Sequence, residues 1–72
     1  MTDEVVTDLA EFDLPFGRKA TLKNVAHESG LQMLRLTLRE GRRFTIIDLD
    51  PASASTLGSE MATWASIKAV ET

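Results

Sequence analysis

The sequence predicts an α+β fold in which a three-stranded antiparallel sheet is followed by one C-terminal helix packed on a face of the sheet (βββα), with an N-terminal arm. The stretch LQMLRLTLRE alternates apolar and polar residues, which is the two-residue period of a half-buried strand. From Pro51 to Ala69 the apolar residues instead recur at helical spacing. A chain of 72 residues makes one small domain. We divide it into an acidic arm (1–16), a β-meander (17–50) and a helix (51–70).

The arm is predicted from its charge, because residues 1–16 contain no lysine or arginine. The LPFGR stretch combines Pro15 and Gly17, a turn signal that separates the arm from the sheet. The apolar residues of the arm are candidates to cover a face of the sheet. The acidic residues are Asp3, Glu4, Asp8, Glu11 and Asp13, and the apolar candidates are Val5, Leu9, Phe12, Leu14 and Phe16.

Two strands follow the arm. KATLKNVAH predicts the first, and it ends at ESG, where Gly30 suits the positive φ of a tight turn. The second strand is the clearest element of the sequence. Its leucines at 34, 36 and 38 alternate with Arg35, Thr37 and Arg39.

The third strand, RRFTIIDLD, is rich in β-branched and aromatic residues. A two-residue turn at Glu40 and Gly41 would pair Leu36 with Thr45, and a three-residue loop would pair Leu36 with Ile46; we favour the first. The apolar face expected from it consists of Leu34, Leu36, Leu38, Ile47 and Leu49. The third strand is apolar on both faces, so the face opposite the helix needs the arm or another molecule as its cover.

The helix is predicted to begin at Pro51, because Asp50 suits the N-cap and Pro51 the first helical position. One stripe at helical spacing is expected to pack on the sheet: Ala54, Leu57, Gly58, Met61, Trp64, Ala65 and the stem of Lys68. The expected core consists of Leu22, Leu34, Leu36, Leu38, Ile47, Leu49, Leu57, Met61 and Trp64.

A second stripe of the helix consists of small residues spaced by three and four, which is the a/d periodicity of a coiled-coil seam. We expect this seam to be an interface: Ala52, Ser55, Ser59, Ala62 and Ser66. Small neutral side chains let two helices approach closely, and a two-fold contact brings identical patches together. The sequence therefore predicts a homodimer, through this seam or through an arginine-and-phenylalanine face of the sheet.

Residues that could carry chemistry are few. The chain has no cysteine and one histidine, His27, which excludes disulfides, cysteine-ligated zinc and a histidine cluster. Asp48 and Asp50 point the same way on a strand and could hold a cation or form an acid–base pair. However, Asp50 is already explained as a helix cap, and Asp48 as a solvated or arginine-paired group. We therefore expect no enzyme, no catalytic or metal site and no cofactor.

The arginines form a possible surface for an anionic partner, made of Arg35, Arg39, Arg42 and Arg43, with Phe44 interleaved. A solvated face is the favoured explanation, with Asp48 as the counter-charge; a protein contact ranks second, and the net charge of −3 puts nucleic acid third. The predicted function is a small non-catalytic protein-interaction module, an accessory or regulatory subunit with a homodimeric or larger protein partner. The alternative is a small nucleic-acid-binding protein that uses the arginines.

The sequence places the protein in the cytoplasm, away from the membrane. Its first residues lack the basic patch and apolar run of a signal peptide, and no window approaches the ~18 apolar residues of a membrane span.

Three features, FGRKATLKNVAHESG, REGRRFTIIDLDP and an alanine-rich helix with Trp64, resemble a group of short bacterial proteins of unknown function. The resemblance runs from Phe16 to about Ala65. It implies a bacterial cytoplasmic accessory protein and carries no activity, ligand or site.

Overall fold

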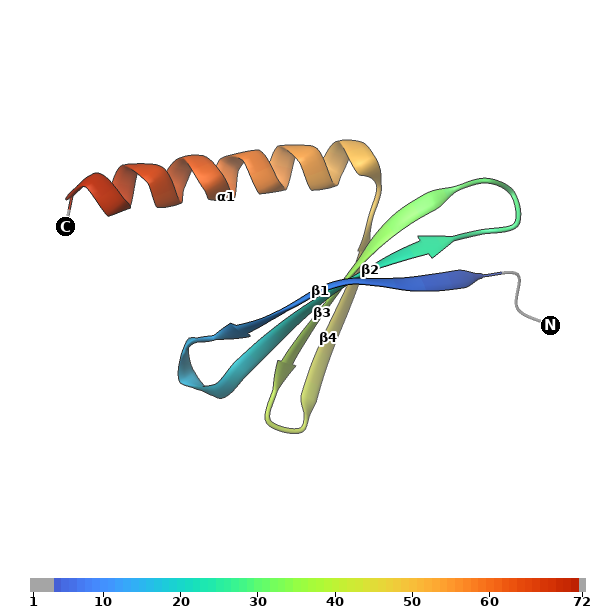
Figure 1. Ribbon diagram of the computed structural model, residues 1–72, viewed down its shortest axis with the longest axis horizontal. Coiled ribbons are helices and arrows are strands. Elements are labelled where there is room, and N and C mark those ends of the chain that lie inside the picture. The colour runs from blue at the N-terminus through green and yellow to red at the C-terminus, as the bar shows by residue number, and fades with distance from the viewer. Residues whose placement is uncertain (1–3, 72) are drawn as a thin grey trace.

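The computed structural model describes residues 4–71. The chain forms a twisted antiparallel sheet that is followed by one long helix, which confirms the predicted α+β order (Figure 1). The elements are β1 (Val5–Leu14), a short 3-10 turn η1 (Pro15–Gly17), β2 (Arg18–Ala26), β3 (Gln32–Glu40), β4 (Arg43–Leu49) and α1 (Pro51–Glu71).

The sheet has four strands in the order β1-β2-β3-β4, so the prediction of three strands was wrong. The residues expected to form an arm make edge strand β1, which lies in the plane of the sheet and covers neither face; Asp3 lies outside the described residues. The physical reason is visible in AEFDL, residues 10–14, where apolar and acidic residues alternate and suit a strand with two different faces. The predicted LPFGR turn is the connection of the β1–β2 hairpin, in which Phe16 (φ 66°) and Gly17 (φ 72°) are left-handed.

The β3–β4 hairpin differs in register from both expected alternatives. Glu40 pairs with Arg43 and Leu36 with Ile47, which leaves Gly41 and Arg42 as the two-residue turn. Gly41 has a φ of 62°, a conformation that costs glycine little, and it therefore occupies the turn instead of flanking it. The register is displaced by two residues from the favoured one. A displacement of two keeps every side chain on its face, so the predicted face from Leu34 to Leu49 is confirmed.

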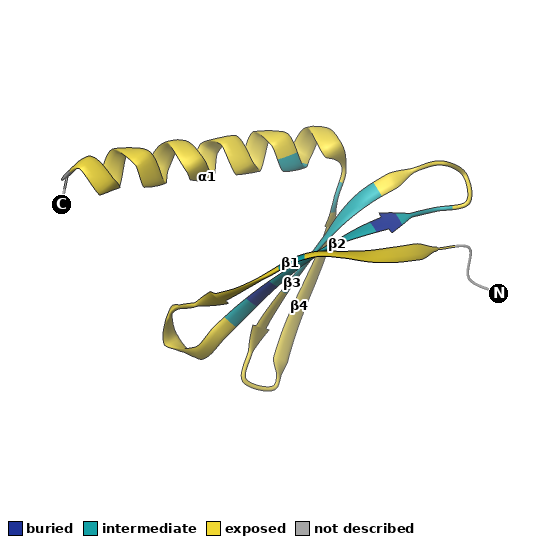
Figure 2. Cartoon of the chain, in the orientation of Figure 1, coloured by how far each residue is buried: buried dark blue, intermediate teal, exposed yellow. Residues whose placement is uncertain are grey.

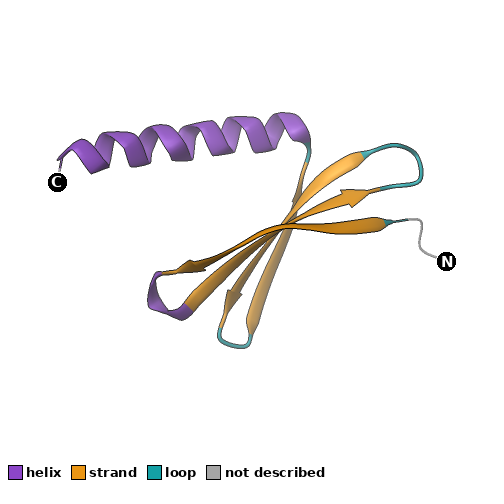
Figure 3. Ribbon diagram, viewed as in Figure 1, coloured by secondary structure: helices purple, strands orange, loops and turns teal. Residues whose placement is uncertain are grey.

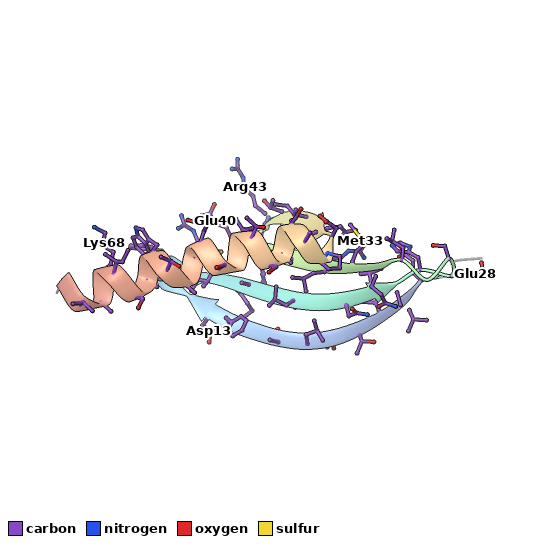
Figure 4. The ribbon with its side chains drawn as sticks, turned by 90° about the horizontal axis from the view of Figure 1, so that it is seen from above. Asp13, Glu28, Met33, Glu40, Arg43 and Lys68 are labelled. Atoms are coloured by element: carbon purple, nitrogen blue, oxygen red, sulfur yellow. The ribbon has the colours of Figure 1, made fainter. Side chains whose placement is uncertain are left out.

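Helix α1 starts as predicted: the amide of Ala54 donates to the carbonyl of Asp50 at 2.9 Å. It then diverges from the sheet (Figure 1), although it passes over the strands when seen from above (Figure 4). Ala54 is half-buried, whereas Met61 and Trp64 are 63% and 64% exposed. The expected packing of the stripe on its own sheet was therefore wrong. Only Asp50 separates β4 from α1, and so short a connection fixes the direction of the helix axis.

Burial is slight throughout the described part of the chain, and Figure 2 shows the buried segments on β2, with half-buried segments on other strands and at the start of α1. Ala20 (8% exposed) and Val25 (0%) are the buried side chains among residues 4–70. The predicted core residues are therefore not buried. Those in the sheet are half-buried or exposed, and those in the helix are exposed. The molecule is open in shape, with extents of 50 × 30 × 15 Å, and its connections are short turns (Figure 3).

Candidate interaction surface

Strand register separates the sheet into two faces of different chemistry. We call one the apolar face, because aliphatic and aromatic side chains predominate on it in all four strands, with Asn24 and Thr45 among them. Alternation along each strand and pairing between strands put them on the same side. The apolar face consists of Ala10, Phe12, Leu14, Ala20, Leu22, Leu34, Leu36, Leu38, Ile47 and Leu49.

The apolar face continues onto the helix. A shallow groove at the start of α1 lies between Leu49, the last residue of β4, and the helix, where Leu57 is the helix-stripe residue that lines it. Its other lining residues are Ala52, Ser53, Thr56 and Glu60. Ala54 is the one residue of α1 that is not exposed among those whose burial is described. The residues that follow it at spacings of three and four therefore extend on the same side of the helix. We call Ala54, Leu57, Met61, Trp64 and Ala65 the helix stripe.

Opposite the apolar face lies a charged face. It also carries apolar residues, the buried Val25 and the exposed Phe44 (62%) and Ile46 (61%), so β4 is apolar on both faces as predicted. One row of the charged face crosses all four strands in the order Asp8, Lys23, Arg35 and Asp48. Lys23 lies 3.5 Å from the carboxylate of Asp8. Arg35 donates to both carboxylate oxygens of Asp48, at 2.8 Å from Nε and 3.0 Å from Nη2. Acids at the two edges thus neutralise bases in the middle of the sheet.

A second row of the charged face, Asp13, Lys19, Arg39 and Phe44, has an acid at the β1 edge and an aromatic ring at the β4 edge. Lys19 of β2 lies 3.3 Å from Glu11 and 3.7 Å from Asp13, both of β1. The guanidinium of Arg39 lies over the ring of Phe44 at 5.8 Å and donates to the carbonyl of Gly41 at 3.2 Å. The acidic residues of the predicted arm therefore pair with the lysines of β2 as members of the same sheet.

Asp48 and Asp50 have separate structural partners. The hydrogen bond from Arg35 lowers the pKa of Asp48 below its ordinary value of 3.8 and raises the pKa of Arg35. Ser53 lowers the pKa of Asp50 through side-chain and backbone hydrogen bonds, as expected of an N-cap. Residues 4–71 hold no group of three metal-ligating side chains. Asp48 is thus held by Arg35 and Asp50 by the start of the helix.

We expect the stability of the protein to fall in acid partly because of Asp48. A depressed pKa means that the carboxylate contributes stability above its ordinary value of 3.8, and that this contribution is lost as the pH falls through the folded value. Thermal unfolding at a series of pH values should show Asp48→Asn less stable than wild type at neutral pH and less sensitive to acid. Parallel pH profiles for the two proteins would contradict this assignment, since Asp50 remains in both.

The structure separates the arginines that were predicted to act together. Arg35 and Arg39 share the charged face, whereas Arg42 lies in the β3–β4 turn. Arg43 pairs in register with Glu40 and so belongs to the side of the apolar face, at its rim. Figure 4 shows the Arg43 side chain extending away from the ribbon. The predicted anionic-partner face is therefore not a single surface.

The predicted seam of the helix is exposed from Ala52 to Ser66. At 100° per residue it lies on the side of α1 roughly opposite the helix stripe, although Ala52 at its start lines the groove together with Leu49 of β4. The role of the seam stays a prediction. Phe12 and Leu14 reach the apolar face from β1, which was not predicted as a strand, although the alternation in AEFDL was the available signal.

Comparison with known proteins assigns the chain to a family but gives it no activity. No curated protein and no solved structure matches the chain. Within residues 4–71 no helix is both long enough and apolar enough to cross a membrane. A family model covers residues 3–67, which confirms the resemblance to an uncharacterised short family: the chain belongs to a family of unknown function, DUF6967.

Proposed function

We propose that the protein is a non-catalytic interaction module, an accessory or regulatory subunit of the cytoplasm that acts by binding protein. One observation carries the proposal: large apolar side chains of the apolar face and the helix stripe stay exposed, among them Ile47 (44%), Met61 (63%) and Trp64 (64%), and the groove between Leu49 and Leu57 lies between the two surfaces. Monomeric proteins rarely expose a contiguous apolar patch of more than a few hundred Å². Such a surface suits a protein partner, which would exclude water from it.

The charged face gives weaker support to the alternative, nucleic acid binding. Lys19, Lys23 and Arg35 each lie within ion-pair distance of an acid on a neighbouring strand. A phosphate backbone would have to compete with those carboxylates, and the net charge of −3 repels it at long range. Arg39 and Arg42 remain the best cations for this role, because neither has an acid within ion-pair distance among the described residues.

Affinity purification of the tagged full chain from cells of its source tests the proposal. We expect protein partners to be retained by wild type and lost by Leu57→Arg, since Leu57 lines the groove. Ser59→Arg places the same charge on the seam and serves as the matched variant. Loss of partners in Ser59→Arg alone would assign binding to the seam.

A binding assay with random DNA and RNA at two salt concentrations tests the alternative. Salt-sensitive binding that disappears in Arg39→Glu/Arg42→Glu, together with no protein retained, would replace the proposal with the alternative.

A further inference from the structure

We propose that the partner on the apolar surface is a second copy of this chain. In this arrangement a two-fold axis relates the two chains, and the helix stripe of each lies on the apolar face of the other's sheet. The inference rests on the proposed function, because it uses the same surface, and it goes further by naming the occupant. The exposed area, length and charge of the surface favour a second copy as its occupant.

The exposed area of the chain is too large for a compact monomer. The accessible surface is 5879 Å², whereas a folded protein of 7.9 kDa exposes roughly 4,400 Å². The excess is roughly 1,500 Å² per chain, or about 3,000 Å² for two chains, which lies within the range of obligate homodimers, about 2,000–5,000 Å². Two copies joined through these surfaces would each have the exposed area of a compact protein.

The length of the surface also suits this contact. The helix stripe runs over 12 residues, from Ala54 to Ala65, and is about 18 Å long at 1.5 Å per residue. Strand β3 has 9 residues and is about 30 Å long at 3.3 Å per residue. The helix stripe of one chain can therefore lie within the length of the apolar face of another. Its own sheet does not receive it, because α1 diverges from the sheet beyond Ala54 (Figure 1).

Charge favours this surface over the opposite one. The apolar face has charged residues only at its rim, where Arg18 pairs with Glu40 and Arg43 follows in register. A two-fold contact through the apolar face therefore brings no like charges together at its centre. A contact through the charged face would place the Lys23–Arg35 row of one chain against an identical row in the other, which costs free energy unless the rows are offset.

Light scattering after size exclusion tests the dimer directly, and Trp64 tests where it forms. We expect twice the chain mass of 7.9 kDa. Trp64 is the only tryptophan and the chain has no tyrosine, so its emission reports one site. The emission should shift to the red on dilution as the dimer dissociates and Trp64 returns to water. A monomer at all accessible concentrations would overturn the inference. The proposed function would survive that result if Leu57→Arg still abolished capture of another protein.

Isotope-filtered NMR on a mixture of labelled and unlabelled chains tests the exchange of helices without any substitution. We expect contacts between the Trp64 ring of one chain and the methyl groups of Leu36 or Ile47 of the other. Met61→Arg should produce monomers, whereas Ser59→Arg, two residues away on the other side of the helix, should remain dimeric. A dimer without these contacts would overturn the arrangement. If only Ser59→Arg dissociated the dimer, the contact would belong to the seam.

Discussion

Replacing Leu36 with aspartate should unfold the protein, whereas the same change at the next residue, Thr37, should leave it folded. Leu36 lies at the centre of the apolar face, between Leu22 of β2 and Ile47 of β4. A carboxylate there has no cation beside it and loses its hydration when the face is covered. Thr37 lies on the charged face, where Arg35 and Arg39 flank it on the same side of the strand.

The expected difference is large against the total stability. A chain of 72 residues has a free energy of unfolding of about 4–11 kcal/mol, and an unpaired charge placed on an apolar surface costs several kcal/mol. Thr37→Asp should change the stability by less than about 1 kcal/mol. Circular dichroism and denaturant titration of the two variants measure both effects. Equal stabilities would show that the apolar face stays in water.

Much of the sheet could be predicted because its signal is local. The leucines at 34, 36 and 38 alternate with polar residues, and this period alone determines which side chains share a face. The same reasoning placed Asp48 beside the arginines, and the Arg35–Asp48 pair confirms it. The exact register could not be predicted, because it depends on which two residues form the turn. Gly41 and Arg42 do so, in place of Glu40 and Gly41.

Strand β1 was not predicted, because the acidic charge of residues 1–16 received more weight than the alternation of apolar and acidic residues. Residues 1–16 hold acids and no bases, which is typical of a solvated terminus. The acids of β1 in fact alternate with Ala10, Phe12 and Leu14, and they pair with the lysines of β2. The complementary charge lies on the next strand, so composition taken segment by segment did not reveal it.

The prediction that α1 packs on its own sheet was wrong for a different reason. The helix stripe is apolar at helical spacing, and that pattern shows that α1 packs on something without showing which chain provides it. Packing of the helix stripe within one chain would require the helix to fold back over its own sheet. The direct connection from Leu49 through Asp50 to Pro51 sends α1 away instead. The expected core residues Leu57, Met61 and Trp64 are therefore candidates for a core shared between chains.

Replacing Trp64 with alanine should weaken the dimer strongly and the isolated chain hardly at all. Trp64 is 64% exposed in the single chain, so its loss there removes little buried area and about 1 kcal/mol or less. Covered by a second chain, the same side chain would be buried, and its removal would cost about 3–5 kcal/mol. At 1.4 kcal/mol for each factor of ten, that cost is at least roughly a 100-fold rise in the dissociation constant.

Thermal unfolding over a range of protein concentrations measures this difference. For a dimer whose folding is coupled to association, the melting temperature rises with concentration. We expect Trp64→Ala to lower the melting temperature, most of all where wild type is dimeric and the variant is not. Val70→Ala is the control, because Val70 is 85% exposed near the end of α1 and lies outside the helix stripe. If Trp64→Ala unfolded at the same temperature as wild type at every concentration, Trp64 would not belong to the interface. A fall that is equally large at every concentration would place Trp64 in the fold of the single chain.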